Sequence, residues 1–148
     1  AINELHTRIS DAIHAVSPHL LALPGCGELT AAKLVGETAG ITRFKSDAAF
    51  ACHSGTAPIP VWSGNTAGRV RLSRAGNRQL NAALHRIALT QIRLTDSPGH
   101  AYYRKRLAQG DSTTEALRCL KRRLARVVYN RLRVDENLRR DTTEPTAA

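Results

Sequence analysis

The sequence predicts a mainly α-helical fold: a helix-hairpin-helix and a helical bundle, with a loop-rich centre and one short β-hairpin. Apolar residues recur at steps of three and four residues through most of the chain, which is the period of a half-buried helix. Four glycines and two prolines concentrate between residues 55 and 77, and the turn sequence Leu-Pro-Gly-Cys-Gly at residues 23–27 separates two helical patterns. A chain of 148 residues is long enough to bury the core of one domain.

The first predicted element is an amphipathic helix over residues 2–16, whose apolar side carries Ile2, Leu5, Ile9 and Ile13. Ser17-Pro18 ends this helix, because proline cannot continue the helical hydrogen bonding. The chain starts at Ala1, directly before the helix, and contains no methionine. We therefore expect residues 1–17 to be the end of a helical arm, and the chain to be a fragment of a longer protein whose N-terminal half is missing.

The second predicted element is a hairpin over residues 20–39, in which Gly25 and Gly27 join two short helices. Glycine permits a positive φ and lets two backbones come close together. The N–H groups of the turn, and of the helix that restarts near Thr30, then lack helical partners and can donate to a phosphate oxygen. Such contacts bind a nucleic-acid backbone without reading its bases. The alternative is an ordinary tight turn between two helices that binds nothing.

Local signals place the central elements. Gly40 ends the second helix of the hairpin, and Ser46 caps a short helix that runs through His53. The alternating residues 69–72 predict a short strand inside the loop-rich centre. Residues 76 to about 94 have a helical period, and the apolar side of this helix contains Leu80, Leu84, Ile87 and Gln91.

The C-terminal third predicts two further helices. A short one contains Tyr102 and Tyr103 and ends at Gly110. Ser112 and Glu115 have the spacing of a capping box, and they start the longest helix, which we expect to end near Val134. Its predicted core side consists of Leu117, Leu120, Leu124, Val127, Val128 and Leu132. Residues 18–134 are thus predicted to form one domain, followed by a disordered C-terminal tail over residues 135–148.

The charge distribution favours a polyanionic partner. The net charge is +10, and 18 of the 22 basic residues are arginine, which binds phosphate through two parallel hydrogen bonds. Residues 48–134 carry 16 basic and three acidic side chains, with no carboxylate between Asp47 and Asp96. The longest helix carries a stripe of three arginines, Arg118, Arg122 and Arg126, which is predicted to contact nucleic acid; the alternative is that the stripe is only a solvated helix surface. The predicted nucleic-acid contacts are Gly25, Gly27, Thr30, Arg69, Arg71, Arg74, Gly76, Asn77, Arg78 and the stripe Arg118, Arg122 and Arg126.

Other classes of protein have little support in the composition. Cys26, Cys52 and Cys119 are unevenly spaced, so neither a disulfide framework nor a zinc site is predicted, and we assign no metal ligand or cofactor to this chain. No apolar run is long enough to span a membrane. Residues 1–20 lack the basic start and continuous apolar run of a signal peptide. We expect a soluble, cytoplasmic protein.

Several short motifs of this chain together resemble one family. They are Leu-Pro-Gly-Cys-Gly at 23–27, Arg-Phe-Lys-Ser at 43–46, Gly-Thr-Ala-Pro-Ile-Pro at 55–60, Ser-Gly at 63–64, Gly-Asn-Arg-Gln-Leu at 76–80 and Ala-Tyr-Tyr at 101–103. In this order they resemble the C-terminal transposase domain of the DEDD insertion-sequence transposases, relatives of the pilin-gene inverting recombinases and of the bridge-RNA-guided recombinases. The resemblance covers about residues 20–132. It implies a second half that this chain lacks, an N-terminal RuvC-like domain with four metal-binding acids, joined through a long helical arm.

The resemblance also implies that Ser63, in the Ser-Gly that follows the Ala-Pro segment, is a nucleophile that attacks DNA. Such an attack would leave a covalent phosphoserine and free the other strand end, which conserves bond energy for rejoining. Taken without the resemblance, this Ser-Gly is a turn in a glycine-rich loop. Ser54 and Ser73 are fallback candidates for the nucleophile. His53 and His85 are candidates for a general base, but a structural role is the better explanation for each of these two histidines.

The predicted function is that of a DNA transposase or recombinase domain of a bacterial insertion sequence, located at the nucleoid. It would bind DNA and a guide RNA, and supply the serine nucleophile for strand cleavage and exchange. No carboxylate lies near Ser63 in the sequence, so we expect magnesium to be held by the RuvC-like half and this fragment alone to be inactive. The alternative function is that of a non-catalytic nucleic-acid-binding helix-hairpin-helix module. A homo-oligomer in the active complex, formed through the leading arm, is compatible with both.

Overall fold

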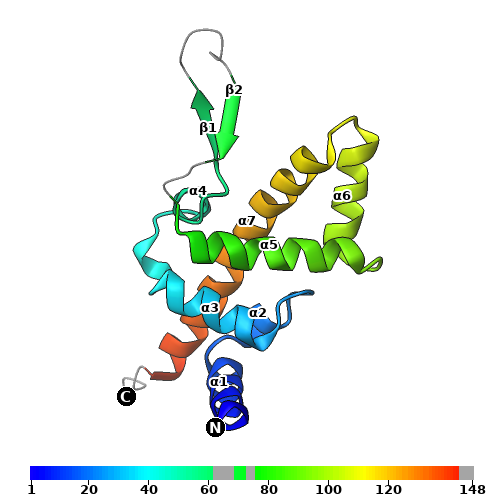
Figure 1. Cartoon of the computed structure of the whole chain (residues 1–148). Coiled ribbons are helices and arrows are strands. Elements are labelled where there is room, and N and C mark those ends of the chain that lie inside the picture. The colour runs from blue at the N-terminus through cyan, green and yellow to red at the C-terminus, as the bar shows by residue number, and fades with distance from the viewer. Residues whose placement is uncertain (62–68, 73–75, 144–148) are drawn as a thin grey trace.

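The computed structural model describes residues 1–61, 69–72 and 76–143, and within residues 58–75 it describes the backbone of two strands alone. The described chain is mainly helical, as predicted (Figure 1). In chain order its elements are α1 (Ile2–Val16), α2 (Pro18–Leu21), α3 (Glu28–Thr38), the 3₁₀ helix η1 (Ile41–Arg43), α4 (Asp47–His53), β1 (Pro58–Val61), β2 (Arg69–Leu72), α5 (Arg78–Arg93), α6 (Pro98–Ala108) and α7 (Thr113–Thr143).

Helix α7 is the longest element and contacts α2, α4, α5 and α6 along its length (Figure 1). One cluster of buried apolar side chains joins these helices with α3, and it includes Leu34, Phe50, Ile87 and Val128. Burying a side chain of this size stabilises the fold by roughly 1.5–3 kcal/mol. The predicted core sides of α5 and α7 are confirmed, because Leu80, Leu84, Ile87, Gln91, Leu120, Leu124, Val128 and Leu132 are buried and Leu117 and Val127 are partly buried.

Two of the predicted helix caps are present. At the start of α4, the Ser46 hydroxyl accepts a hydrogen bond from the N–H of Ala49 at 3.2 Å. At the start of α7, Ser112 Oγ accepts from the N–H of Glu115 at 3.2 Å, and Glu115 Oε2 accepts from the N–H of Ser112 at 3.3 Å. Such bonds satisfy N–H groups that the helix cannot pair, and each is worth about 1 kcal/mol. Because a cap depends on neighbouring residues alone, both could be read from the sequence.

Helix α7 extends beyond the end that we predicted for it. We expected it to end near Val134, followed by a disordered tail, but residues 135–143 continue the helix to Thr143. The last five residues, 144–148, lie outside the described part of the chain. The sequence from Asp135 onwards is polar, and its local support is the ion pairing of Glu136 with Arg139 and Arg140, three and four residues later. Tertiary contacts add to this local support.

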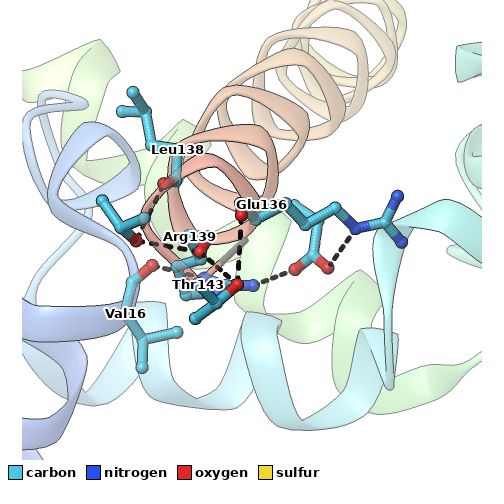
Figure 2. Close-up of polar contacts among 7 residues, drawn as sticks. Val16, Glu136, Leu138, Arg139 and Thr143 are labelled. Carbon is cyan, nitrogen blue, oxygen red and sulfur yellow. Dashed lines mark hydrogen bonds and ion pairs between the residues drawn. The ribbon is translucent and has the colours of Figure 1, made fainter. Parts of the chain in front are cut away.

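The C-terminal part of α7 holds the junction between α1 and α2. The Asp135 carboxylate is buried and accepts from the backbone N–H groups of His19, at 3.1 Å, and Leu20, at 3.2 Å. Figure 2 shows Arg139, one helical turn later, donating to the carbonyl oxygen of Val16 at the end of α1. These bonds satisfy backbone groups at two helix ends and so stabilise the added turns of α7.

Helix α1 is only partly covered by the described chain. Ile13 is buried, but Ile2 and Leu5, which belong to the same predicted apolar side, are 85% and 57% exposed. Near its C-terminal end, His14 Nε2 lies 2.9 Å from Glu28 Oε1 of α3. The C-terminal part of α1 is thus anchored to the rest of the fold, while its N-terminal part extends from it (Figure 1).

The loop-rich centre contains the predicted short strand, β2, paired antiparallel with β1 in the register Ile59 to Arg71 and Val61 to Arg69. This hairpin projects from the helices, between α4 and α5 (Figure 1). At its base Gly76 packs against Gly55, so closely that a Cβ added to Gly76 would lie 2.5 Å from the Gly55 Cα. Gly76 therefore has no room for a side chain, and Gly55 has a φ of +73°, which also favours glycine.

Candidate nucleic-acid interface

The turn between α2 and α3 is fixed against α5 through Gly25. Its φ is +84°, and a Cβ added there would lie 3.1 Å from the Ile87 carbonyl oxygen and 3.2 Å from the Thr90 Cβ. Gln91 Nε2 also donates to the carbonyl oxygen of Pro24, at 2.7 Å. Gly25 therefore faces α5, and packing alone explains why a glycine stands at this position.

The start of α3 is open to solvent. Gly27, the residue before the helix, is exposed, and a Cβ added there would meet nothing within 4 Å. Among the described residues no side chain caps this helix, so its first N–H groups remain available to an acceptor such as a phosphate oxygen. Glu28 lies in this first turn, and its hydrogen bonds with His14 and Ser10 hold the pKa of its carboxyl below the usual value. When His14 is protonated, it offsets the charge that Glu28 presents to an anion.

A groove of about 170 Å³ lies between α3 and α5 and begins at this open helix start. Of its described lining residues, two are basic and none is acidic, and two alanines leave room for a ligand. The predicted contact Thr30 lines it together with Lys33, which we did not predict. The signal for Lys33 was its position one helical turn after Thr30. The lining residues are Leu29, Thr30 and Lys33 of α3 and Ala82, Ala83 and Arg86 of α5.

At the start of α5, two of the three predicted contacts have structural partners. Asn77 Oδ1 accepts from two N–H groups of the first turn of α5, at 2.9 and 3.0 Å, and its Nδ2 donates to Glu37 Oε2 at 3.1 Å. Gly76 packs against Gly55. Arg78 is exposed. Among the described residues, the cationic group at this helix end is the guanidinium of Arg78.

The predicted arginine stripe of α7 is exposed and leads towards the hairpin. Arg118, Arg122 and Arg126 are all exposed, and Arg126 Nε lies 2.9 Å from Asp47 Oδ2. Because both partners of this ion pair are solvent-accessible, it contributes at most about 1 kcal/mol and leaves Arg126 able to exchange partners. Arg122 and Arg126 also line a groove of about 170 Å³ with Asp47, Ala48, Ala51, Cys52 and Ala57, the residue directly before β1.

The predicted nucleophile and one predicted arginine lie outside the described residues. Ser63 belongs to the segment between β1 and β2, and Arg74, like the fallback candidate Ser73, lies between β2 and α5. Arg69 and Arg71 are residues of β2. The described strands β1 and β2 flank, in the sequence, the segment that contains Ser63, and β1 follows directly after Ala57, which lines the groove with Arg122 and Arg126.

The alternative nucleophile Ser54 is buried at the end of α4. Its hydroxyl donates to the Ala51 carbonyl oxygen at 3.2 Å and lies 3.1 Å from Thr56 Oγ1. Its neighbour His53 contacts Arg43 through its ring nitrogen at 3.2 Å, and burial and the Arg43 charge lower the pKa of His53. Burial and the Lys121 charge likewise lower the pKa of His85. Packing and local hydrogen bonds explain why a serine stands at position 54. A phosphodiester could not reach this buried hydroxyl unless the surrounding residues unfolded.

The described residues show neither a metal-binding cluster nor a membrane-spanning helix. Over residues 1–61, 69–72 and 76–143 no group of three or more His, Cys, Asp and Glu side chains is arranged to hold a metal ion. Cys26 is buried, and burial raises the pKa of its thiol to about 12. None of the described helices is long and apolar enough to cross a membrane.

Comparison with known proteins identifies relatives of the chain. The profile of the family described as "Transposase IS116/IS110/IS902 family" matches residues 17–104. The insertion element IS110 uncharacterized 43.6 kDa protein of Streptomyces coelicolor is 34% identical over 120 residues, which are 81% of this chain and 29% of that protein. The insertion element IS900 uncharacterized 42 kDa protein of Mycobacterium paratuberculosis is 32% identical, over 81% of this chain and 30% of its own length. The insertion element IS116 uncharacterized 44.8 kDa protein of Streptomyces clavuligerus is 30% identical, over 76% of this chain and 28% of its own length. The chain therefore spans less than a third of the length of these relatives.

Proposed function

Because the chain belongs to the IS116/IS110/IS902 transposase family, we propose that it binds DNA within a longer transposase and supplies the serine nucleophile for strand exchange. The observation that carries this proposal is the sequence position of Ser63, between the two strands of a hairpin that starts beside exposed arginines. A nucleophile for phosphoryl transfer must act on a phosphate that cations hold in place, and the arginine stripe of α7 supports such binding at the hairpin base.

In the proposed reaction, the Ser63 hydroxyl oxygen attacks the phosphorus of a DNA phosphodiester. The bond from phosphorus to one deoxyribose oxygen breaks, the serine proton passes to a base or to water, and the leaving oxygen is protonated. The products are a phosphoserine ester and a strand with a free hydroxyl end. Attack by the hydroxyl of another strand on this ester rejoins DNA and restores the serine. The number of phosphoester bonds is unchanged, so exchange needs no external energy source.

The proposal assigns the remaining parts of the reaction to partners. We place the magnesium that this chemistry uses in a RuvC-like half of the longer protein, in line with the family resemblance and the greater length of the relatives. The chain alone is then proposed to bind nucleic acid without cleaving it. A guide RNA, a homo-oligomeric active complex and a location at the bacterial nucleoid complete the proposal.

Substitution of the serine in the full-length transposase tests the proposed reaction. Ser63→Ala is expected to abolish strand exchange and leave nucleic-acid affinity within about two-fold, because it removes one hydroxyl and little surface. A denatured, protease-treated reaction of the unsubstituted protein should contain a DNA-linked peptide that includes Ser63. Undiminished exchange by Ser63→Ala, or a link at Ser54 or Ser73, would reject the assignment.

A second candidate function is that of a non-catalytic nucleic-acid-binding module. The observation that favours it is the groove between α3 and α5, whose cations Lys33 and Arg86 belong to elements other than the hairpin. This groove needs no nucleophile in order to bind a phosphate backbone. The two candidates separate in the same experiment, because a module without chemistry would form no covalent DNA link at Ser63.

A further inference from the structure

A lysine and an asparagine connect three elements below the hairpin. Lys121 of α7 is only 8% exposed, and its Nζ donates to Asn81 Oδ1 of α5 at 2.8 Å. Asn81 Nδ2 in turn donates to the carbonyl oxygens of Ser54, at 3.1 Å, and Gly55, at 3.3 Å. These two carbonyl groups belong to the connection from α4 to β1. The amide of Asn81 is therefore the link between the α7 cation and the chain that enters the hairpin.

Lysine is an unusual residue to bury at this position. None of the ion pairs in the described part of the chain includes Lys121. Burial and the neighbouring Arg118 both lower the pKa of Lys121. A partly buried cation with only a neutral acceptor costs stability, and an apolar side chain of similar length would fill the same space without that cost. Packing alone therefore does not explain the lysine.

The backbone contacts at the hairpin base and the Asn81–Lys121 link hold different parts of the chain together. Gly55 and Gly76 pack together, and the N–H of Asn77 donates to the His53 carbonyl oxygen at 2.6 Å. These contacts join the two ends of the hairpin to each other. Asn81 and Lys121 instead join the entering chain to α5 and α7, which carry Arg78 and the arginine stripe.

From these contacts we infer that Lys121, acting through Asn81, is a positioning residue that sets the hairpin relative to the arginine-bearing face of α7. The inference rests on the proposed function in one respect: the positioned hairpin is the one whose sequence includes Ser63. The residue acts through hydrogen bonds to backbone carbonyl groups, and it does not contact the reacting atoms.

Trp62 provides a direct test, because it is the only tryptophan and lies in the sequence between β1 and β2. Its fluorescence, with acrylamide as the quencher, is measured on this chain for the unsubstituted protein and for Lys121→Met, which keeps an unbranched side chain of similar length. We expect the quenching constant to change about two-fold while the far-UV circular dichroism spectrum stays the same. The matched control, Lys105→Met on α6, removes an exposed charge and should leave quenching unchanged. Unchanged quenching in a folded Lys121→Met protein would overturn the inference.

A second variant covers the case in which Lys121→Met does not fold. Asn81→Asp keeps an acceptor for Lys121, and gives the cation a counter-charge, but it loses both donors to the Ser54 and Gly55 carbonyl groups. We expect the same change in Trp62 quenching, with Asn130→Asp on the exposed side of α7 as the control. If neither Lys121→Met nor Asn81→Asp folds, the inference is overturned, because the link then holds the whole domain and not the hairpin.

Strand exchange by the full-length transposase distinguishes this inference from the proposed function. Lys121→Met should lower the rate of exchange at saturating DNA about ten-fold and leave the dissociation constant for DNA, and its salt dependence, within about two-fold. A flatter salt dependence would overturn the inference by making Lys121 a phosphate contact. If Ser63→Ala retains exchange while Trp62 quenching still responds to Lys121→Met, positioning of the hairpin is supported and the serine assignment alone fails.

Discussion

The Cα of Gly25 lies against the backbone carbonyl of Ile87, where an added Cβ would be 3.1 Å from the oxygen. Two residues later, Gly27 has open space at the corresponding position. Glycine therefore stands at these two positions of one short turn for different physical reasons. Gly25 attaches the turn to α5, and Gly27 leaves the start of α3 uncovered, so that substitutions can separate folding from binding.

Gly27→Asp is expected to weaken nucleic-acid binding several-fold without loss of stability. The aspartate side chain would cap the free N–H groups of α3 and place a negative charge where we propose a phosphate to bind. Binding to a DNA duplex would be measured by fluorescence anisotropy at low salt, and stability by urea unfolding. Gly36→Asp, inside α3 and equally unobstructed, is the control for the change in net charge.

For Gly25→Ala, in contrast to Gly27→Asp, a loss of stability is expected. A non-glycine residue at φ +84° costs roughly 1–2 kcal/mol, to which crowding against Ile87 adds. Urea unfolding should show this loss. If Gly27→Asp bound as tightly as Gly36→Asp in folded protein, the start of α3 would not be part of the interface.

Lys33 and Arg86 are expected to contact phosphates from opposite sides of their groove. The affinity for DNA should fall steeply with salt, and Lys33→Gln and Arg86→Gln should each reduce the slope of log K against log salt by about one. Arg104→Gln, an exposed arginine of α6 outside the described grooves, serves as the control. Slopes equal to that of the control would place the groove outside the interface.

Asp135→Asn is expected to destabilise the protein by roughly 1–3 kcal/mol, because the amide replaces one of the two oxygens that accept from His19 and Leu20. The loss of protection against hydrogen exchange should be greatest where α1 meets α2. Hydrogen exchange of residues 13–20 would detect it, alongside urea unfolding. Asp141→Asn, on the exposed end of the same helix, should change stability by less than about 0.5 kcal/mol. Equal effects of the two substitutions would contradict the role given to Asp135.

Cys26 and Cys52 are expected to differ in their reactivity. Burial raises the pKa of the Cys26 thiol to about 12, so the thiol is almost entirely protonated at pH 8. Iodoacetamide at pH 8 should therefore label exposed Cys52 and leave Cys26 unmodified until the protein unfolds. Because the pKa is raised, reactivity of Cys26 should increase as the pH rises towards 12. Mass spectrometry of the tryptic peptides measures both, and equal labelling of Cys26 and Cys52 at pH 8 would contradict the packing of the turn.

Features that depend on neighbouring residues could be predicted from the sequence. The caps at Ser46 and Ser112 use atoms within four residues, and the buried side of α5 follows from the helical period of Leu80, Leu84 and Ile87. The short strand at residues 69–72 followed from alternation. The assignment of Ser63 has a different source, since it depends on the family resemblance, and it stays a prediction.

Other features depend on residues that are distant in the sequence. Gly25 and Gly76 stay predicted phosphate contacts, and the structure adds a packing reason for each, since Ile87 and Gly55, which only folding brings near, leave no room for a side chain. The end of α7 is ordered by backbone groups of His19 and Leu20, more than 100 positions away. The sequence by itself determined the helices, their caps and the excess of arginine, because these follow from local hydrogen bonding, periodicity and composition. Only the tertiary structure decided which glycines are packed and which are open, since that depends on which surfaces meet.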